Sequence, residues 1–443
     1  MPATSFAGSG RPPVGAGHAR DSSAPDAVWR TRHAPDPVGR ILSPCVAAAA
    51  ARTRDTPAMS RPIPALLDMF DRLLAAPSVS CTDPALDQGN RAVIDLLAGW
   101  CAALGFRVEV QEIPGRPGKA NLIAVLGEGP GGLVLAGHTD TVPFDADLWH
   151  VDPFRLTQRE ERLYGLGATD MKGFFPIALE AALSVRGMRL KEPLILVATA
   201  DEESSMDGAK LLVAAGKPRA RHAVIGEPTD LRPVRLHKGM MMEAVTVSGQ
   251  SGHSSNPALG NNALDGMHRV ITELLAFRAE LALRHRNPLF EVEVPTLNLG
   301  CIHGGDNPNR ICGQCELHFD LRPLPGMEPE ELRVTIRERL ARIAGETGLG
   351  IRMRPLFPGL SPFAEDAMAP VVRAAEEFTG HAAGQVGFAT EGPFMQQLGM
   401  QTVVMGPGSI AQAHQPDEYM EQRQVEPAVR VLTSMIRRLC ADA

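Results

Sequence analysis

The chain has 443 residues and a formal net charge of -7, and 44% of its residues are hydrophobic, as in ordinary globular proteins. An acidic chain is not expected to bind nucleic acid, and no segment approaches the ~18 uninterrupted apolar residues that a membrane span requires. Seven scattered cysteines, an odd number, do not suggest a disulfide framework, so we expect a reducing, cytoplasmic setting.

Residues 1–58 differ in composition from the rest of the chain. They contain eight prolines and seven arginines but no lysine and no glutamate, and they show no sustained amphipathic period. Such a segment cannot bury enough apolar surface to fold, so we predict a disordered N-terminal extension. A transit peptide is an alternative because the segment carries arginines, although its four aspartates disfavour it. The favoured alternative is that Met59 is the true start and that the segment before it is an extension without function.

From about residue 61 onward, apolar residues recur at helical or strand-like spacing. Helical spacing covers 66–74 and 88–104, strand-like runs cover 106–113, 121–126 and 132–137, a helical stretch covers 172–186, and strand-like runs cover 190–199 and 222–226. Several runs are apolar throughout, which is typical of strands that are buried on both faces. The alternation predicts an α/β fold with a mainly parallel sheet and helices on both of its faces.

The pattern changes near Gly239. A strand at 242–249, a helix at 261–283, strands at 290–300 and 310–322, a helix at 329–347 and a strand at 350–356 follow in that order. The order β-α-β-β-α-β is that of a ferredoxin-like α+β unit. We therefore predict a larger domain of residues 59–238 and 356–443, into which a smaller domain of residues 239–355 is inserted.

Histidine and acidic side chains stand where several of these apolar runs end. His138 and Asp140 follow the run at 132–137, Glu202 and Glu203 follow 190–199, Glu227 follows 222–226, His414 lies a short loop beyond a run at 402–405, and Asp170 precedes the helix at 172–186. Ligands of open α/β sheets bind outside the carboxyl ends of the strands, so we expect these side chains to converge. Two histidines and at least three carboxylates suit a pair of zinc-like ions bridged by one carboxylate.

Each of these residues also has an ordinary structural explanation. Asp170 could cap the helix that follows it, and Glu202 and Glu203 could open a helix, where carboxylates are favoured. Glu227 could belong to a turn, and His414 could be a loop histidine. Their occurrence together, at several strand ends, favours the metal site.

Six stretches of the chain resemble the motifs of a known enzyme family. GHTDTVP, YGLGATDMKG, ATADEE, IGEP, GQSGHSS and the C-terminal histidine occur in the order found in the dinuclear zinc peptidase and deacylase family. The resemblance runs from about residue 61 to the end of the chain. It implies a metal-dependent amidohydrolase that holds two divalent ions, which could be zinc or cobalt because both accept the same ligands.

The resemblance also implies a role for each polar residue. Asp140 would accept the second ring N–H of His138 and fix its tautomer. Glu202 would be the general base, since consecutive side chains diverge and its neighbour can hold metal while Glu202 faces the water. The implied metal ligands are His138 and Glu227 at one ion, Glu203 and His414 at the other, and Asp170 bridging both.

The smaller domain is implied to act as a lid and to form a homodimer. His253 would come from the partner subunit and donate a hydrogen bond to the developing oxyanion. Asn309 and Arg322 match family positions that contact the substrate, and the guanidinium fork of an arginine suits a carboxylate. A turn histidine and an ordinary strand-end salt bridge are the alternatives for His253 and Arg322.

The segment ATEGPF, residues 389–394, bears on the substrate. In the family's desuccinylases an arginine at the Pro393 position would receive a second carboxylate, whereas here Glu391 offers a negative charge. A cationic tail fits that charge, so the implied reaction is hydrolysis of N2-acetyl-L-ornithine to L-ornithine and acetate, in arginine biosynthesis. The alternatives are hydrolysis of another N-acyl amino acid or dipeptide, including succinyl-diaminopimelate, and a non-catalytic binding protein on the same fold.

Overall fold

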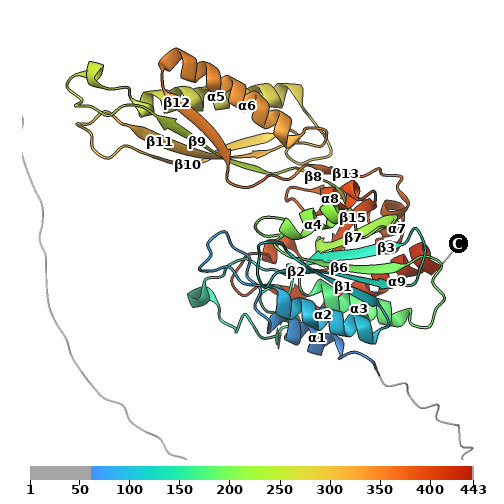
Figure 1. Cartoon of the computed structure of the whole chain (residues 1–443). Helices are drawn as coiled ribbons and strands as arrows, with labels where there is room; N and C mark the ends of the chain where they lie inside the picture. The colour runs from blue at the N-terminus through green and yellow to red at the C-terminus, as the bar shows by residue number, and fades with distance from the viewer. Residues whose placement is uncertain (1–60, 442–443) are drawn as a thin grey trace, which may run out of the picture. The chain divides into compact units, whose positions relative to one another are not determined.

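The computed structural model describes residues 61–441. The predicted extension at 1–58 lies outside the described residues. Within residues 61–441 the chain builds a nine-stranded sheet, a four-stranded sheet and a three-stranded sheet (Figure 1). No helix of this described part is long and apolar enough to cross a membrane.

The nine-stranded sheet is parallel at its centre and antiparallel towards its edges, except that the short edge strand at 384–386 runs parallel to its neighbour. Its order is β1 (Arg107–Glu112), β2 (Ala120–Leu126), β6 (Leu194–Thr199), β3 (Leu133–His138), β7 (His222–Pro228), β15 (Gln401–Gly406), β8 (Val234–His237) and β13 (Phe363–Ala364), with β14 (Gly384–Val386) paired to β8. The neighbours β6, β3, β7 and β15 are parallel, whereas β1, β2 and β13 are antiparallel to their neighbours. The predicted α/β class, with parallel strands at its core, is confirmed.

Helices cover both faces of this sheet because alternate strand residues point to opposite sides. The helices are α1 (Leu66–Leu74), α2 (Arg91–Ala103), α3 (Phe174–Ser184), α4 (Asp207–Ala215), α7 (Pro370–Thr379), α8 (Gly392–Gln397) and α9 (Val425–Ile436). Leu133 and Leu135 of β3 share an apolar cluster with α1, α2, α3, α7 and α9. Val134 and Ala136 share another with α4 and α8. Figure 1 shows α4 and α8 on one side of the sheet and α1, α2 and α3 on the other.

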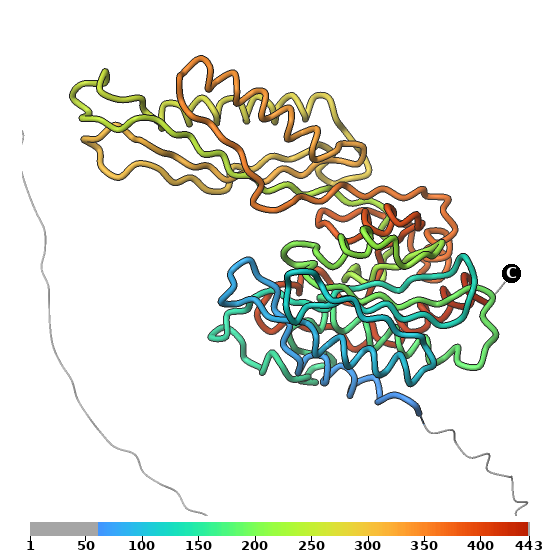
Figure 2. The backbone as a smooth tube through the Cα atoms, viewed as in Figure 1, coloured from blue at the N-terminus to red at the C-terminus, as the bar shows by residue number. Residues whose placement is uncertain are grey.

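The four-stranded sheet is antiparallel and has the expected chain order. Its strands lie in the order β10 (Thr296–Gly304), β11 (Gln314–Arg322), β9 (Met241–Ser248) and β12 (Gly350–Pro355), and its helices are α5 (Ala263–Arg284) and α6 (Pro329–Thr347). Figure 2 traces the chain from β8 into this sheet and back. That residues 239–355 form a lid and a dimerisation domain stays a prediction.

Two strands of the smaller sheet begin later than expected, and one of them is β11, which begins at Gln314 instead of residue 310. A strand was expected from residue 290, but β10 begins at Thr296. Pro295 stands in the intervening stretch, and proline has no N–H to donate to a sheet. The strand therefore starts directly after this proline.

The remaining sheet has three short strands. These are β4 (Thr157–Arg159), β5 (Arg162–Tyr164) and β16 (Tyr419–Glu421), in the order β16-β5-β4. The pairing of β16 with β5 is antiparallel, with Tyr419 opposite Tyr164. It joins the segment after His414 to the segment before Asp170, which brings two distant parts of the chain together.

Candidate metal centre

Five of the predicted side chains form two groups that have one member in common. His138, Asp170 and Glu227 form one group, and Asp170, Glu203 and His414 form the other. Within each group the candidate ligand atoms lie within 4.8 Å of one another. The structure thus places together all five residues that the sequence singled out as metal ligands.

The first group follows from the pairing of two central strands. His138 is the last residue of β3, and Ala136 of this strand pairs with Ile225 of the parallel neighbour β7. Continuing this register by two residues along each strand places His138 opposite Glu227. The Nε2 atom of His138 lies 3.0 Å from Asp170 Oδ1 and 4.0 Å from Glu227 Oε1, and all three side chains are buried.

The second group contains the other carboxylate oxygen of Asp170. The Nε2 atom of His414 lies 3.4 Å from Asp170 Oδ2 and 3.0 Å from Glu203 Oε1. Asp170 therefore offers one carboxylate oxygen to each group. That is the arrangement required of a carboxylate that bridges two ions.

The electrostatics of the metal-free chain fit the same interpretation. Burial opposes charge on His138, but its hydrogen bond with Asp170 and the nearby carboxylates raise the pKa of the imidazole. Hydrogen bonds with Asp170 and Glu203 raise the pKa of His414 to about 10. Burial, followed by the charge of Asp170, raises the pKa of Glu227. A raised pKa means that the group holds a proton more tightly, and these protons occupy the positions where a metal cation would be bound. Two imidazoles and three carboxylates are a suitable donor set for two divalent ions.

Asp140 contacts His138 through a different atom from the one expected. The Nδ1–H of His138 donates to the backbone oxygen of Asp140 at 2.9 Å, whereas Asp140 Oδ1 is 3.7 Å away. The carboxylate instead accepts the backbone N–H of Glu203 through Oδ2 at 3.0 Å. The tautomer of His138 is still fixed, with Nε2 directed towards Asp170. The group that fixes it is the backbone carbonyl of Asp140 and not its carboxylate.

Glu202 lies in the turn that follows β6, next to the candidate ligand Glu203. Burial, and after it the charges of Glu227 and other carboxylates, raise the pKa of Glu202 well above its ordinary value. The turn begins at Asp201, a residue with φ of +61°, and the carboxylate of Asp201 accepts hydrogen bonds from Ser80 Oγ and Lys119 Nζ. Backbone strain of this kind is common where side chains are presented at functional sites.

The three predicted residues of the smaller domain belong to neither group. His253 and Asn309 are exposed. Arg322 donates through Nε to Asp320 Oδ1 at 3.0 Å, so the structure contains the ordinary salt bridge considered above. The Nδ1 atom of His253 accepts the backbone N–H of Ser255 at 3.2 Å, which leaves the ring proton of the neutral imidazole on Nε2.

Glu391 directly precedes helix α8 and is buried. Its side chain is 1% exposed, and neither carboxylate oxygen has a hydrogen-bond partner within residues 61–441. Burial raises the pKa of Glu391 to about 7, although the nearby hydroxyl of Thr199 lowers it. A buried acceptor without a donor is costly, which marks this carboxylate as a place for a cation or a donor from outside the protein.

Sequence reasoning missed two buried charged residues beside the site. Lys119 pairs with Asp201 and Asp87, and Glu418 accepts backbone N–H groups of the segment that carries Asp170. The only sequence feature that points to Glu418 is its place four residues after His414. Nothing in the sequence around Lys119 distinguishes it from an exposed lysine.

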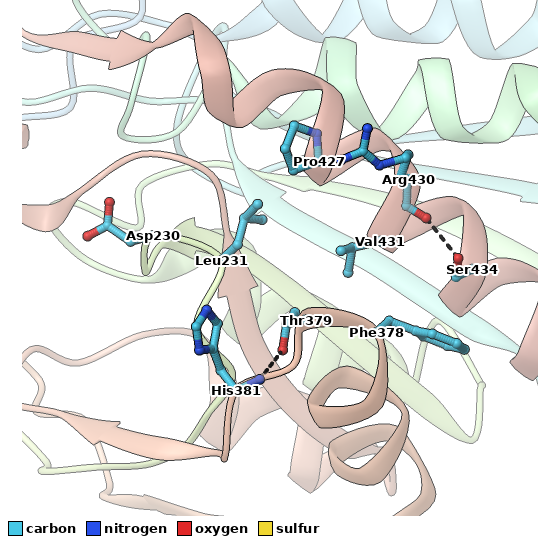
Figure 3. Close-up of a pocket in the computed structure, with 9 residues that line it drawn as sticks. All are labelled: Asp230, Leu231, Phe378, Thr379, His381, Pro427, Arg430, Val431 and Ser434. Atoms are coloured by element: carbon cyan, nitrogen blue, oxygen red, sulfur yellow. Dashed lines mark hydrogen bonds between the residues drawn. The ribbon is translucent and has the colours of Figure 1, made fainter.

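The predicted site residues do not line the cavity drawn in Figure 3. A cavity of about 500 Å³ is lined by side chains that include Asp230, Phe378, His381 and Arg430 (Figure 3). It contains none of the predicted residues. His414 instead borders a cavity of about 50 Å³, beside Phe144 and Trp149.

Comparison with other proteins gives matches along most of the chain. Residues 134–438 match the sequence profile of peptidase family M20/M25/M40. An acetylornithine deacetylase from Edwardsiella ictaluri (strain 93-146) is 47% identical over 382 residues, which cover 86% of this chain and 100% of that protein. Among solved structures, an M20 family metallo-carboxypeptidase from Sulfolobus solfataricus has a TM-score of 0.65 at 19% identity, over 84% of this chain and 98% of that one. A dinuclear metal-binding peptidase of the M20 family from Bacillus subtilis has a TM-score of 0.59 at 14% identity, over 84% of this chain and 96% of that one.

Proposed function

Because the chain belongs to peptidase family M20/M25/M40, we propose that it hydrolyses N2-acetyl-L-ornithine to L-ornithine and acetate, a step of arginine biosynthesis. The relative from Edwardsiella ictaluri, matched along its whole length, is named acetylornithine deacetylase. The observation that carries the proposal is the position of Asp170, which offers one oxygen to each of two ligand groups. A metal-dependent amidohydrolase needs this arrangement, whereas a non-catalytic binding protein has no use for it.

The two groups would hold two divalent ions, with zinc and cobalt both suited to the donor set. His138 and Glu227 would bind one ion, Glu203 and His414 the other, and Asp170 both. Such ions, when bound, lower the pKa of water from 15.7 toward ~7 and polarise a carbonyl oxygen. The protein supplies the fixed donors that hold them a short distance apart.

Glu202 is proposed as the general base. Its raised pKa suits a carboxylate that takes a proton from the attacking water and later returns it to the leaving amine. Glu203, the proposed metal ligand, is the neighbour of Glu202 in the same turn. A metal ion held by Glu203 would therefore keep Glu202 near the reacting water. The C–N bond of the amide breaks as that proton reaches the nitrogen, which leaves acetate and a free α-amino group.

His253 is proposed to act in the active site of the partner subunit of a homodimer. With its Nδ1 occupied by Ser255, its Nε2–H is available as a donor to the oxyanion. Asn309 and Arg322 would contact the substrate from the same inserted domain. Arg322 would then exchange Asp320 for the substrate carboxylate, since its fork can bind both oxygens.

Glu391 is proposed to receive the δ-ammonium group of the substrate. The desolvation of this carboxylate has already occurred in the folded chain, because it is buried without a partner. A cation that reaches it gains a strong interaction at low dielectric. A neutral side chain at the same place gains nothing comparable.

A hydrolysis panel tests the proposed function. The chain is stripped of metal, reloaded with Zn²⁺ or Co²⁺, and assayed on acetylornithine, acetylmethionine, succinyl-diaminopimelate and a dipeptide. We expect the highest kcat/KM on acetylornithine and no turnover in the metal-free form. Another preferred substrate refutes the specificity, and a metal-loaded chain that cleaves none of the four refutes the enzyme.

A further inference from the structure

Glu418 is a buried carboxylate whose hydrogen bonds all go to one short segment. Its Oε1 accepts the backbone N–H groups of Thr169 at 2.7 Å and Asp170 at 3.0 Å, and its Oε2 accepts that of Gly167 at 3.0 Å. The side chain is 2% exposed. Both oxygens of Glu418 are thus used to hold the segment that carries Asp170.

This arrangement is not an ion pair. None of the salt bridges among residues 61–441 includes Glu418. Lys172 lies close enough for the charge of Glu418 to affect its pKa. Three N–H donors occupy the two oxygens without a cation, although burial outweighs these hydrogen bonds and raises the pKa of Glu418 to about 7. The partner of Glu418 is therefore the backbone of residues 167–170.

The backbone of this segment has little room to shift. Gly167 has φ of +83°, and a Cβ atom there would lie 2.8 Å from Lys172 Cε and 2.9 Å from Thr141 Cγ2. A backbone packed this closely has only one accessible conformation. A change at Glu418 would therefore displace Asp170, because the loop has no room to compensate by shifting elsewhere.

The same two segments are also joined by contacts that do not involve the Glu418 side chain. The backbone N–H of Gly165 donates to the carbonyl oxygen of Glu418 at 3.0 Å, and Thr169 Oγ1 donates to the carbonyl oxygen of Tyr419 at 2.6 Å. Strand β16 pairs with β5. Loss of the Glu418 carboxylate should therefore leave the fold in place.

We propose that Glu418 is a positioning residue for the bridging carboxylate of Asp170, an inference that rests on the proposed two-metal site. Asp170 must direct Oδ1 towards His138 and Oδ2 towards His414 at once. A small rotation of the 167–170 segment would favour one group at the expense of the other. Glu418, four residues after His414, fixes that segment relative to the loop that supplies the second histidine.

The hydrogen-bond chemistry shows which variant is informative. In Glu418→Gln one oxygen becomes an NH₂ group, which faces backbone N–H donors instead of accepting from them. An amide can satisfy the donors on one side only. Outer partners of metal ligands typically contribute about 10–100-fold to metal affinity, so we expect a loss of that size for Glu418→Gln and a smaller one for Glu418→Asp, which keeps both oxygens.

The matched control is the neighbouring residue. Asp417 also accepts backbone N–H groups from a distant loop, those of His150 and Val151, but that loop carries none of the proposed ligands. Both of these N–H groups donate to Oδ1, which an asparagine keeps, so Asp417→Asn should lose only the contact between Oδ2 and the imidazole of His150 and should not alter metal affinity.

The test measures Zn²⁺ and Co²⁺ dissociation constants, metal content and the Co²⁺ absorption spectrum for the wild-type chain and these variants, with thermal unfolding of each metal-free form. Weaker binding and an altered Co²⁺ spectrum in Glu418→Gln, with wild-type values in Asp417→Asn, support the inference. Wild-type affinity in Glu418→Gln overturns it, as does an equal loss in both variants. If Glu418→Gln does not fold, Glu418→Asp decides by the same comparison. A wild-type chain that binds fewer than two ions refutes the proposed function instead.

Discussion

The Nε2 atom of His138 lies 3.0 Å from Oδ1 of Asp170 in a fully buried hydrogen bond at the carboxyl end of β3. A proton between these two groups stands where a metal ion would be bound. Proton and metal therefore compete for the same atoms, and the competition makes metal binding depend on pH.

Metal affinity should rise with pH. The pKa of His414 is raised to about 10 by its hydrogen bonds with Asp170 and Glu203, so below that pH a metal must displace a proton from the imidazole. The apparent affinity should increase by up to about tenfold per pH unit for each proton released, and should level off near pH 10. Titration calorimetry in two buffers of different ionisation enthalpy counts the protons; a constant affinity from about pH 6 to about pH 8 would contradict the assignment of His414 as a ligand.

The two adjacent glutamates should separate catalysis from metal binding. Glu202→Ala should lower kcat by about 10²–10⁴-fold, the usual contribution of a general base, and should retain both ions. Glu203→Ala should lose one ion as well as activity. Metal content by mass spectrometry and kcat on acetylornithine distinguish them, and an active Glu202 variant would refute the mechanism.

His253→Ala should lower kcat by about 10²–10³-fold, as expected for the loss of one oxyanion donor. Mixing this variant with Glu202→Ala should restore activity, because a hybrid dimer has one site with both residues intact. Random exchange of subunits between two-fold dimers gives about a quarter of the wild-type rate. A mixture that stays inactive after subunit exchange would show that His253 does not act across the dimer.

Glu391→Gln should raise KM for acetylornithine more than KM for acetylmethionine. A hydrogen bond to a charged group contributes about 1.5–3 kcal/mol, so we expect a difference of at least about tenfold between the substrates. Acetylmethionine is the internal control, because its side chain carries no charge. Equal effects on both substrates would rule out recognition of the δ-ammonium by Glu391.

Lys119→Met should destabilise the metal-free chain by about 3–5 kcal/mol, the range for removing one partner of a buried ion pair. The variant leaves Asp201 buried without its cation, since both side chains are nearly inaccessible. Lys217 pairs with Glu109 on the surface, so Lys217→Met should cost only about 0–1 kcal/mol. Urea unfolding compares the two, and equal losses would contradict the buried pair at Lys119.

The sequence was sufficient to predict the central strands and the residues at their ends. Strands β3, β6 and β7 are fully buried and are apolar except near their ends, so the hydrophobicity of each strand could be recognised from its own sequence. Parallel pairing then brings His138 level with Glu227. The order of the smaller sheet was likewise visible, because β11 alternates between buried and half-buried residues.

Other features depend on packing that a single sequence does not reveal. Short elements such as β13, with two residues, carry too few positions to show a period. The carbonyl of Asp140, rather than its carboxylate, meets His138 because the backbone turns directly after β3. Lys119 and Glu418 look like surface residues in the sequence, and only the surrounding chain makes them buried.

The proposed ligands are spread along the chain from position 138 to position 414, and the ribosome releases them in that order. A nascent chain that has completed β7 already contains His138, Asp170 and Glu227. It still lacks His414, which follows β15, the strand that pairs with β7. The first ligand group can therefore assemble before the second, which can be completed only after His414 has also left the ribosome.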